Sequence, residues 1–330
     1  MRRLTMKTLS FACLSFAACA SADLAAPDAS PPISTIPTHI TGTYDLMGQL
    51  DLQTLPEPAT YVLSELASAT DSPDDPARYL IDQMVAGMPE GTWKAIATGL
   101  AGYVAPYVET EIDRIAPRFA PGIRAISAGL NAIARHITTL ERLSISADGT
   151  TTRALVGLQL ANTPVEFAAG GAADSLALSR SVIDNTGTLA IASHHLSFPF
   201  GEMLRLGLDR AVIPPIDLSA GDLATALRDL VDCHQLGITF ADHAGFGSAS
   251  MYETACGAGM TALASKIYDR LAAIDLASSF ELEVSGTAVG VDHDGDGTMD
   301  VITNGTWVGA TNYAGTKGPL GLATFTGEKE

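Results

Sequence analysis

The chain has 330 residues, of which 47% are hydrophobic and only 17% are charged, so it can bury a sizeable core and is not a disordered polypeptide. Its 19 basic and 37 acidic residues give a formal net charge of −18 at pH 7. A surface this acidic repels phosphate backbones and anionic lipid headgroups, which argues against nucleic acid as a partner.

The N-terminus predicts export. Arg2, Arg3 and Lys7 precede an apolar run from Leu9 to Ala18, which is shorter than the roughly 20 residues of a membrane-spanning helix. The stretch Phe16-Ala17-Ala18-Cys19 resembles the lipobox of bacterial lipoproteins, although leucine is commonest where Phe16 stands. The resemblance implies that residues 1–18 are a signal peptide, that Cys19 is acylated, and that the lipid holds the protein on the outer membrane or another periplasmic face. The alternative is cleavage after Ala20-Ser21-Ala22 and ordinary secretion.

Residues 19–39 are rich in Ala, Ser, Pro and Thr and show no periodic pattern. Such a segment cannot bury enough apolar surface to fold, so we expect a disordered tether between the lipid and a single domain at 40–330. Removal of residues 1–18 takes away three basic residues and leaves 16 basic against 37 acidic residues, a balance of −21.

The domain begins with a predicted strand at 40–52, followed by a helical part at 58–141. Within this part, apolar residues recur every three or four positions from Trp93 to Leu140, which predicts one apolar stripe along helices. Three prolines must divide or kink these helices: Pro106, Pro117 and Pro121. We expect the stripe to pack on a sheet, and the alternative is that it lines a groove for an apolar ligand or touches a membrane.

Residues 142–200 change to the pattern of strands separated by turn residues, among them the hairpin turn Asp148-Gly149, and predict an antiparallel meander. Residues 201–275 return to a helical pattern, and the chain ends in a β-hairpin at 279–327. Because strand runs and helix runs are segregated, the fold class is α+β. We expect the antiparallel sheet to pack against the N-terminal helical segment and a disulfide-linked helix pair.

The cysteines support export. Cys13 lies in the signal and Cys19 is the predicted site of acylation, which leaves Cys233 and Cys256 as one pair in an oxidising compartment. The sequence predicts a disulfide that joins two helices across a Gly-rich link at 237–247. Two free buried thiols are the alternative, and the spacing matches no common zinc site.

The most specific motif is Asp292-His293-Asp294-Gly295-Asp296-Gly297-Thr298-Met299-Asp300. Acidic residues at alternate positions converge when the backbone coils tightly, and Gly297 permits the turn, so the loop offers the oxygen ligands that calcium prefers. It resembles the calcium loops of EF-hand-like and related DxDxDG modules. The resemblance implies five ligands, with Thr298 contributing its carbonyl: Asp292, Asp294, Asp296, Thr298 and Asp300.

The flanks differ from those of an EF-hand. Position 12 is Thr303, where an EF-hand has a bidentate Glu, and the residues on both sides of the loop have strand patterns. We therefore expect a calcium loop at the tip of the C-terminal hairpin, with a structural role.

The sequence contains none of the motifs G-x-S-x-G, H-E-x-x-H or S-x-x-K, and we predict no catalytic residue. These features favour a non-enzymatic cell-envelope protein with a structural calcium site, whose domain binds an apolar ligand or another envelope protein. Two alternatives remain: an exported hydrolase whose site is assembled from residues far apart in the sequence, and a calcium-dependent surface adhesion module.

Overall fold

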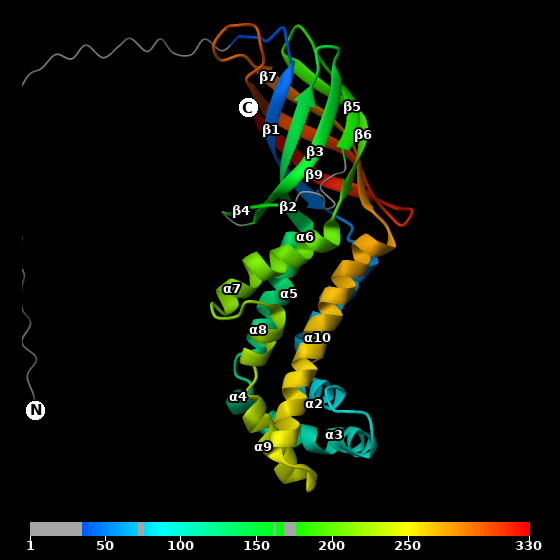
Figure 1. Cartoon of the computed structure of the whole chain (residues 1–330), viewed down its shortest axis with the longest axis vertical. Coiled ribbons are helices and arrows are strands. Elements are labelled where there is room, and N and C mark those ends of the chain that lie inside the picture. Colours follow the sequence, from blue (N-terminus) through cyan, green and yellow to red (C-terminus); the bar gives the residue numbers. More distant parts are fainter. Residues whose placement is uncertain (1–34, 72–75, 161–162, 168–175) are drawn as a thin grey trace, which may run out of the picture.

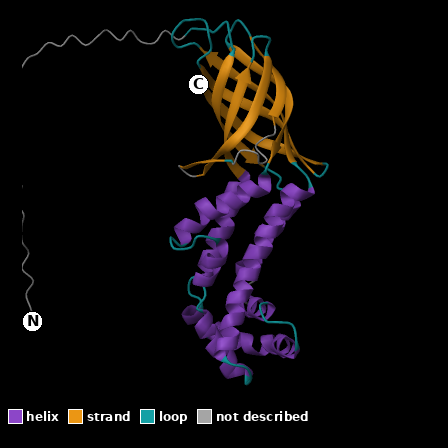
Figure 2. Ribbon diagram, in the orientation of Figure 1, coloured by secondary structure: helices purple, strands orange, loops and turns teal. Residues whose placement is uncertain are grey.

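The computed structural model describes residues 35–71, 76–160, 163–167 and 176–330. The predicted signal peptide, Cys13 and Cys19 lie outside these residues. The described chain is a mixed helix and strand protein in two parts, a β-barrel and an elongated helical part attached to one end of it (Figures 1 and 2).

The barrel is a meander that closes on itself. Consecutive strands pair antiparallel, and the first strand also pairs with the last, so that eight strands form a ring. The short β4 lies outside the ring and pairs only with β3. The strands are β1 (Gly42–Leu52), β2 (His136–Ile145), β3 (Thr150–Leu160), β4 (Thr163–Glu166), β5 (Leu176–Ile183), β6 (Thr188–Phe198), β7 (Phe280–Val291), β8 (Val301–Tyr313) and β9 (Thr316–Lys329).

The closed barrel corrects the prediction of a sheet packed against helices. Along β1, Tyr44, Leu46 and Leu50 are buried while the residues between them are more exposed, as the two-residue period of a strand requires. The inward side chains of all the strands face one another across the barrel and make its core. An eight-stranded barrel is just wide enough for such side chains to fill it, so no helix layer is needed to cover the sheet.

The helical part consists of two insertions into the barrel. Residues 53–135 separate the paired strands β1 and β2, and residues 199–279 separate the paired strands β6 and β7. Both insertions leave and rejoin the barrel at the same end (Figure 1). The helices are α1 (Glu57–Asp71), α2 (Pro76–Ala86), α3 (Thr92–Thr110), α4 (Ile112–Ile115), α5 (Phe119–Arg135), α6 (Phe200–Gly207), η2 (Leu208–Val212), α7 (Ile213–Ile216), α8 (Leu223–Asp229), α9 (Cys233–Ala244) and α10 (Ala249–Ala277).

Two predicted boundaries are wrong. The first helical part ends at Arg135 and not at residue 141, because β2 already begins at His136 and buries every second residue from Ile137 to Ile145. The predicted link at 237–247 is mostly helical, because Asp232 caps α9 by accepting a hydrogen bond from the Gln235 N–H.

The apolar stripe from Trp93 to Leu140 does not pack on the sheet. Its α5 portion is buried against α1, α6 and η2, and only the end of α5 contacts the barrel, at β1 and β2. In α3 the buried side of the helix packs on α2 and α9 at the end of the helical part farthest from the barrel, whereas most of the large stripe residues are exposed, among them Trp93, Ile96, Tyr103 and Tyr107. Pro106 lies inside α3, whereas Pro117 separates α4 from α5. Within the described part of the chain, none of the helices has the length and apolar content that crossing a bilayer requires.

The disulfide between Cys233 and Cys256 is confirmed. It joins the first turn of α9 to α10, with a Cα–Cα distance of 5.6 Å. The cap of α10 is Ser248, which accepts a hydrogen bond from the Met251 N–H, so only a short link at 245–248 separates the two helices. The bridge therefore holds α9 against α10 at the end of the helical part farthest from the barrel.

Candidate functional site

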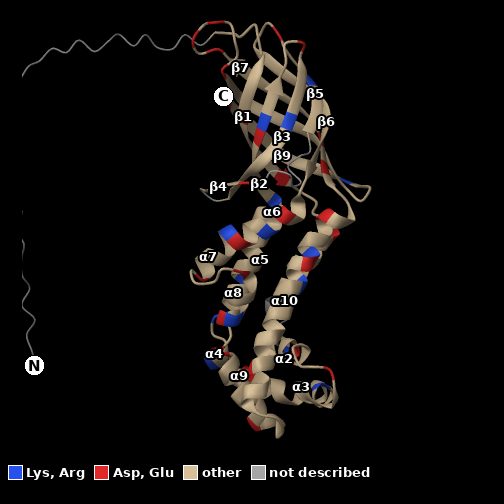
Figure 3. Ribbon diagram, in the orientation of Figure 1, with Lys and Arg blue, Asp and Glu red and all other residues tan. Residues whose placement is uncertain are grey.

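The DxDxDG loop joins β7 to β8, so its predicted position at the tip of a hairpin is confirmed. It lies at the end of the barrel opposite the helices (Figure 1). The hairpins β2–β3 and β5–β6 turn at the same end, where Asp148 and Asp184 accept hydrogen bonds from backbone N–H groups of their own turns. This end of the barrel carries a concentration of acidic residues, which Figure 3 shows in red.

Three of the predicted ligands converge. Asp292, Asp294 and Asp300 each offer a carboxylate oxygen, and these three oxygens lie within 4.8 Å of one another. Asp292 is buried, Asp300 is half-buried and Asp294 is exposed, so a bound ion would have protein on one side and solvent on the other. Three carboxylates at this separation repel one another, and a divalent cation would remove that repulsion.

The backbone of the loop is hydrogen-bonded to the carboxylate of Asp292. Its Oδ1 accepts a hydrogen bond from the Gly295 N–H at 2.7 Å, and its Oδ2 accepts one from the Gly297 N–H at 2.8 Å. The Thr35 hydroxyl donates a further bond to Oδ2 at 2.7 Å. These bonds, that from Thr35 foremost, hold the pKa of Asp292 below its ordinary value. Since each carboxylate oxygen has two lone pairs, Asp292 can accept these bonds and still coordinate an ion.

The conformation of the loop explains why position 297 is a glycine. Gly297 has a φ of 86°, in the left-handed region that a side chain disfavours, and a Cβ there would lie 3.2 Å from the Thr38 hydroxyl oxygen. This agrees with the sharp turn that the motif predicts at Gly297.

The other two predicted ligands lie outside the triplet. Asp296 accepts a hydrogen bond from the Thr298 N–H at 2.6 Å through Oδ1. Thr298 is predicted to contribute its main-chain carbonyl, an atom that a cluster of acidic side chains does not include. Asp300 is tied back into the loop, because its Oδ2 accepts the His293 N–H at 2.9 Å. The structure thus brings together three of the four carboxylates that the motif suggested.

The sequence does not reveal that the start of the described chain docks on this loop. Thr35 and Asp292 exchange backbone hydrogen bonds in both directions, and the Gly297 carbonyl accepts the N–H groups of Thr38 and His39. The His39 carbonyl in turn accepts the Met299 N–H. Residues 35–39, predicted as the end of a disordered tether, are therefore bound to the candidate calcium loop. Thr35 lies 257 positions from its partner, so no local pattern could have indicated the contact.

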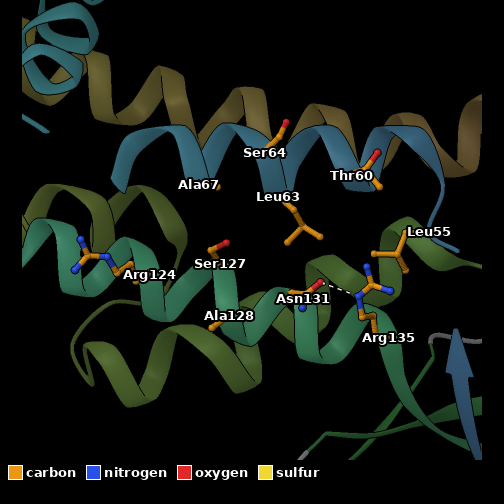
Figure 4. Close-up of a pocket in the computed structure, with 10 residues that line it drawn as sticks. All are labelled: Leu55, Thr60, Leu63, Ser64, Ala67, Arg124, Ser127, Ala128, Asn131 and Arg135. Atoms are coloured by element: carbon orange, nitrogen blue, oxygen red, sulfur yellow. Dashed lines mark hydrogen bonds between the residues drawn. The ribbon is translucent and has the colours of Figure 1, made fainter. Parts of the chain in front are cut away.

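A cavity of about 510 Å³ lies between α1 and α5 (Figure 4). Its lining includes the apolar Leu55 and Leu63 and the basic Arg124 and Arg135, and Arg135 donates a hydrogen bond to Asn131 at 3.1 Å. None of its lining residues is a histidine, a cysteine or a carboxylate. This cavity therefore holds no acid–base pair of the kind that the alternative of an exported hydrolase requires.

The barrel interior holds a buried polar network that sequence analysis missed. Arg153 and Glu141 are both fully buried, and they pair through two hydrogen bonds, Nε to Oε2 at 2.6 Å and the second guanidinium nitrogen to Oε1 at 2.9 Å. The guanidinium carbon lies 3.9 Å from the centre of the Trp307 ring. The remaining arm of Arg153 donates to His194 Nε2 at 3.0 Å. Charged residues at inward positions of a barrel could have been found only once the inward face was known.

His194 completes this network as a neutral ring. Because Nε2 accepts from Arg153, its Nδ1 carries the proton and donates to the Ala192 carbonyl at 2.9 Å. Burial, reinforced by the neighbouring Arg153, lowers the pKa of His194 from its ordinary value of 6.5. Its neighbour His195 is exposed, as the alternation of a strand requires.

This arrangement predicts a loss of stability in acid. The unfolded chain protonates His194 near its ordinary pKa, whereas the folded protein does so only at lower pH. The stability that the folded state gains from keeping His194 neutral is fully present above that ordinary pKa. It is lost as the pH falls from there toward the lowered pKa. We expect His194→Gln, which keeps an acceptor for Arg153, to reduce the fall in unfolding free energy between neutral and mildly acidic pH. Urea unfolding at several pH values measures this, with the exposed His195→Gln as the matched control. An unchanged pH dependence in His194→Gln would contradict it.

Comparison of the chain with protein-family models, with curated proteins and with solved structures finds no match.

Proposed function

We propose that this protein is an exported, non-enzymatic component of a bacterial cell envelope, held to the membrane by a lipid on Cys19. In this proposal the Asp292–Asp300 loop binds calcium and strengthens the joint between the N-terminal tether and the folded domain. The observation that carries the proposal is the docking of residues 35–39 onto that loop. In this proposal, a force applied to the membrane anchor reaches the folded domain through these docked residues.

Calcium suits this position for two reasons. The cluster of Asp292, Asp294 and Asp300 supplies hard oxygen ligands, and calcium outside the cytoplasm is abundant enough to occupy sites of only 10⁻⁴–10⁻³ M affinity. Asp292 bonds both to the loop and to Thr35, so an ion bound to its carboxylate would order the two segments together. The Cys233–Cys256 bridge is consistent with the same oxidising compartment.

The test is a calcium titration of the oxidised protein. We expect the unfolding free energy to rise by about 1.4 kcal/mol when free calcium is about tenfold above its Kd, because an ion that binds only the folded state stabilises it by mass action. Calorimetry and urea unfolding measure the rise, and limited proteolysis should show that calcium protects residues 35–39. Asp294→Asn should abolish both effects.

Asp148→Asn is the matched control, because it removes an exposed carboxylate from the same end of the barrel but not from the triplet. It should leave the calcium response intact. A melting temperature that is the same with millimolar calcium and with chelator would rule out the calcium site. The anchor is tested separately by mass spectrometry of the mature N-terminus, where an unmodified chain that begins after Ala22 would show ordinary secretion instead.

A further inference from the structure

A second cavity adjoins the one between α1 and α5. It has a volume of about 530 Å³ and lies where the helical part joins the barrel, between the start of α1, the end of α10 and the hairpin of β8 and β9. We call the cavity of Figure 4 the first cavity and this one the second cavity. Leu55 and Thr60 line both, so the two share a wall and together make one elongated groove. Volumes of this size are typical of sites for small molecules.

The first cavity has a positively charged lining. Arg124 and Arg135 line it, and none of the other described residues in its wall is charged. The whole chain carries a net charge of −18, so this cavity is a local reversal of sign that attracts a small anion. The two arginines lie three turns apart on α5, about 16 Å along its axis, so a single headgroup can contact only one of them.

Arg135 is the arginine nearer to the second cavity. Figure 4 shows it beside Leu55, at the end of the first cavity that adjoins the second. Its Nε donates to Asn131 Oδ1 at 3.1 Å, and one of its terminal nitrogens donates to the Gln53 carbonyl at 3.2 Å. Neither acceptor carries a charge, so these bonds position the guanidinium without neutralising it. They use two of its five N–H donors, and the other three remain for a planar anion such as a carboxylate.

The second cavity presents mainly apolar side chains. These are Leu55, Pro56, Pro58, Ala277, Phe280 and Tyr313. The Tyr313 hydroxyl donates a hydrogen bond to the Ile274 carbonyl at 3.2 Å. The Thr311 hydroxyl donates one to the Gly318 carbonyl, also at 3.2 Å. Because these donors already have partners inside the protein, they require no polar ligand, and this part of the groove suits a hydrocarbon chain.

Glu57 determines the direction in which an amphiphile can bind. It is exposed, and among the described residues it is the one carboxylate that lines either cavity. A negatively charged headgroup is repelled from the second cavity by Glu57 and attracted to Arg135 in the first. The apolar tail of the same molecule then extends past Leu55 into the second cavity.

We propose that this groove binds a single-chain amphiphile with an anionic headgroup, of which a long-chain carboxylate is the simplest. The carboxylate accepts hydrogen bonds from Arg135, and the hydrocarbon chain packs on Phe280 and Tyr313. The positive first cavity disfavours a purely apolar molecule, which would bury the guanidinium without a partner. The apolar second cavity disfavours a small inorganic anion, which would leave it unfilled.

The test is a calorimetric titration of the oxidised, exported chain with octanoate, decanoate and dodecanoate, each below its micelle concentration. Cys19→Ser is used so that no attached acyl chain competes for the groove. We expect each longer acid to bind roughly tenfold more tightly than the one before, because two more methylene groups leave water. This proposal does not depend on the calcium site or on the lipid.

The headgroup contact is tested at Arg135. Arg135→Gln should weaken decanoate binding at least ~tenfold and leave the weaker binding of neutral decan-1-ol unchanged, because only the acid uses the positive charge. Arg135→Lys keeps that charge and should retain most of the affinity. Arg180→Gln is the matched control, since Arg180 also donates to a main-chain carbonyl, that of Asp148, but lies on β5 of the barrel.

The tail contact is tested at Ala277, an exposed residue at the end of α10 that lines the second cavity. Ala277→Phe narrows this cavity and should remove the gain in affinity from decanoate to dodecanoate. Leu276→Phe introduces the same ring at the neighbouring position, which lines neither cavity, and should bind all three acids like the parent chain.

A parent chain that binds none of the three acids overturns the proposal, and so does Arg135→Gln that binds decanoate as tightly as Arg180→Gln. The chain-length series tests the groove even if Arg135→Gln does not fold, because equal affinities for the three acids would also overturn the proposal. Flotation with vesicles that contain an anionic phospholipid separates a free amphiphile from a membrane lipid. A chain that binds no decanoate but floats with these vesicles only when Arg135 is present would assign the groove to a membrane headgroup instead.

Discussion

Replacement of Glu141 by Gln should reduce the unfolding free energy by about 3–5 kcal/mol, because it leaves the cation of Arg153 buried without a counter-charge. Glu141 and Arg153 have no exposed side-chain surface, so water cannot take the place of the lost carboxylate. Thr139 donates to Glu141 Oε1 at 2.7 Å, but its neutral hydroxyl cannot replace the lost negative charge. Urea unfolding followed by far-UV circular dichroism measures the loss.

Two comparison variants show whether charge is the cause. The double replacement Glu141→Leu with Arg153→Met removes both charges at similar volume and should recover most of the lost stability, since an apolar pair avoids the cost of burying ions. Glu283→Gln breaks the exposed pair between Glu283 and Lys317 and should change stability little. If Glu141→Gln were as stable as Glu283→Gln, the interior pair would have no special role.

The sequence predicts the elements better than their assembly. Alternating apolar residues indicate β1 and most later strands, and turn residues separate them, because both signals are local. Closure of the barrel depends on β1 pairing with β9, for example Leu46 with Gly327, and no short-range pattern encodes a contact across so much of the chain. The alternative, a sheet covered by helices, has the same local pattern.

The start of β2 shows how a helical and a strand pattern can overlap. Ile137 and Leu140 continue the three- and four-residue spacing of the apolar stripe, so the prediction extends the helical part to 141 and places the first strand of the meander at 142. In the barrel Glu141 points inward and Arg142 outward, where Arg142 pairs with Glu330. Charge normally marks solvent exposure, and Glu141 breaks that rule only because Arg153 neutralises it inside the barrel.

The candidate site likewise has features that a local motif encodes and one that depends on a long-range contact. The DxDxDG motif is contiguous, so the positions of Asp292, Asp294 and Asp300 in one loop could be predicted from spacing alone. The contact of Thr35 with Asp292 could not, because it joins the two ends of the domain. The disulfide could be predicted by elimination, since only Cys233 and Cys256 remain after the signal and the lipobox.

Removal of that disulfide should lower the unfolding free energy by about 3 kcal/mol. Cys233 and Cys256 are 23 positions apart, and a cross-link over a loop of that length restricts the unfolded chain by about this amount in the chain-entropy account. Cys256 is fully buried, so alanine is the better replacement at both positions, because serine would bury a hydroxyl. Urea unfolding of Cys233→Ala with Cys256→Ala, compared with the oxidised parent, measures the difference.

The loss should be confined to one end of the molecule. The bridge fixes α9, and α9 supports α3 through the stacked rings of Tyr107 and His243 and packs on α10 through Phe240 and Tyr252. Hydrogen exchange should therefore become faster in α9 and α3 and stay unchanged in the barrel strands. A reducing agent should produce the same changes in the parent chain and none in the double-alanine variant. If reduction instead accelerated exchange in the barrel, the two parts would unfold as one unit, and the disulfide would stabilise the whole chain.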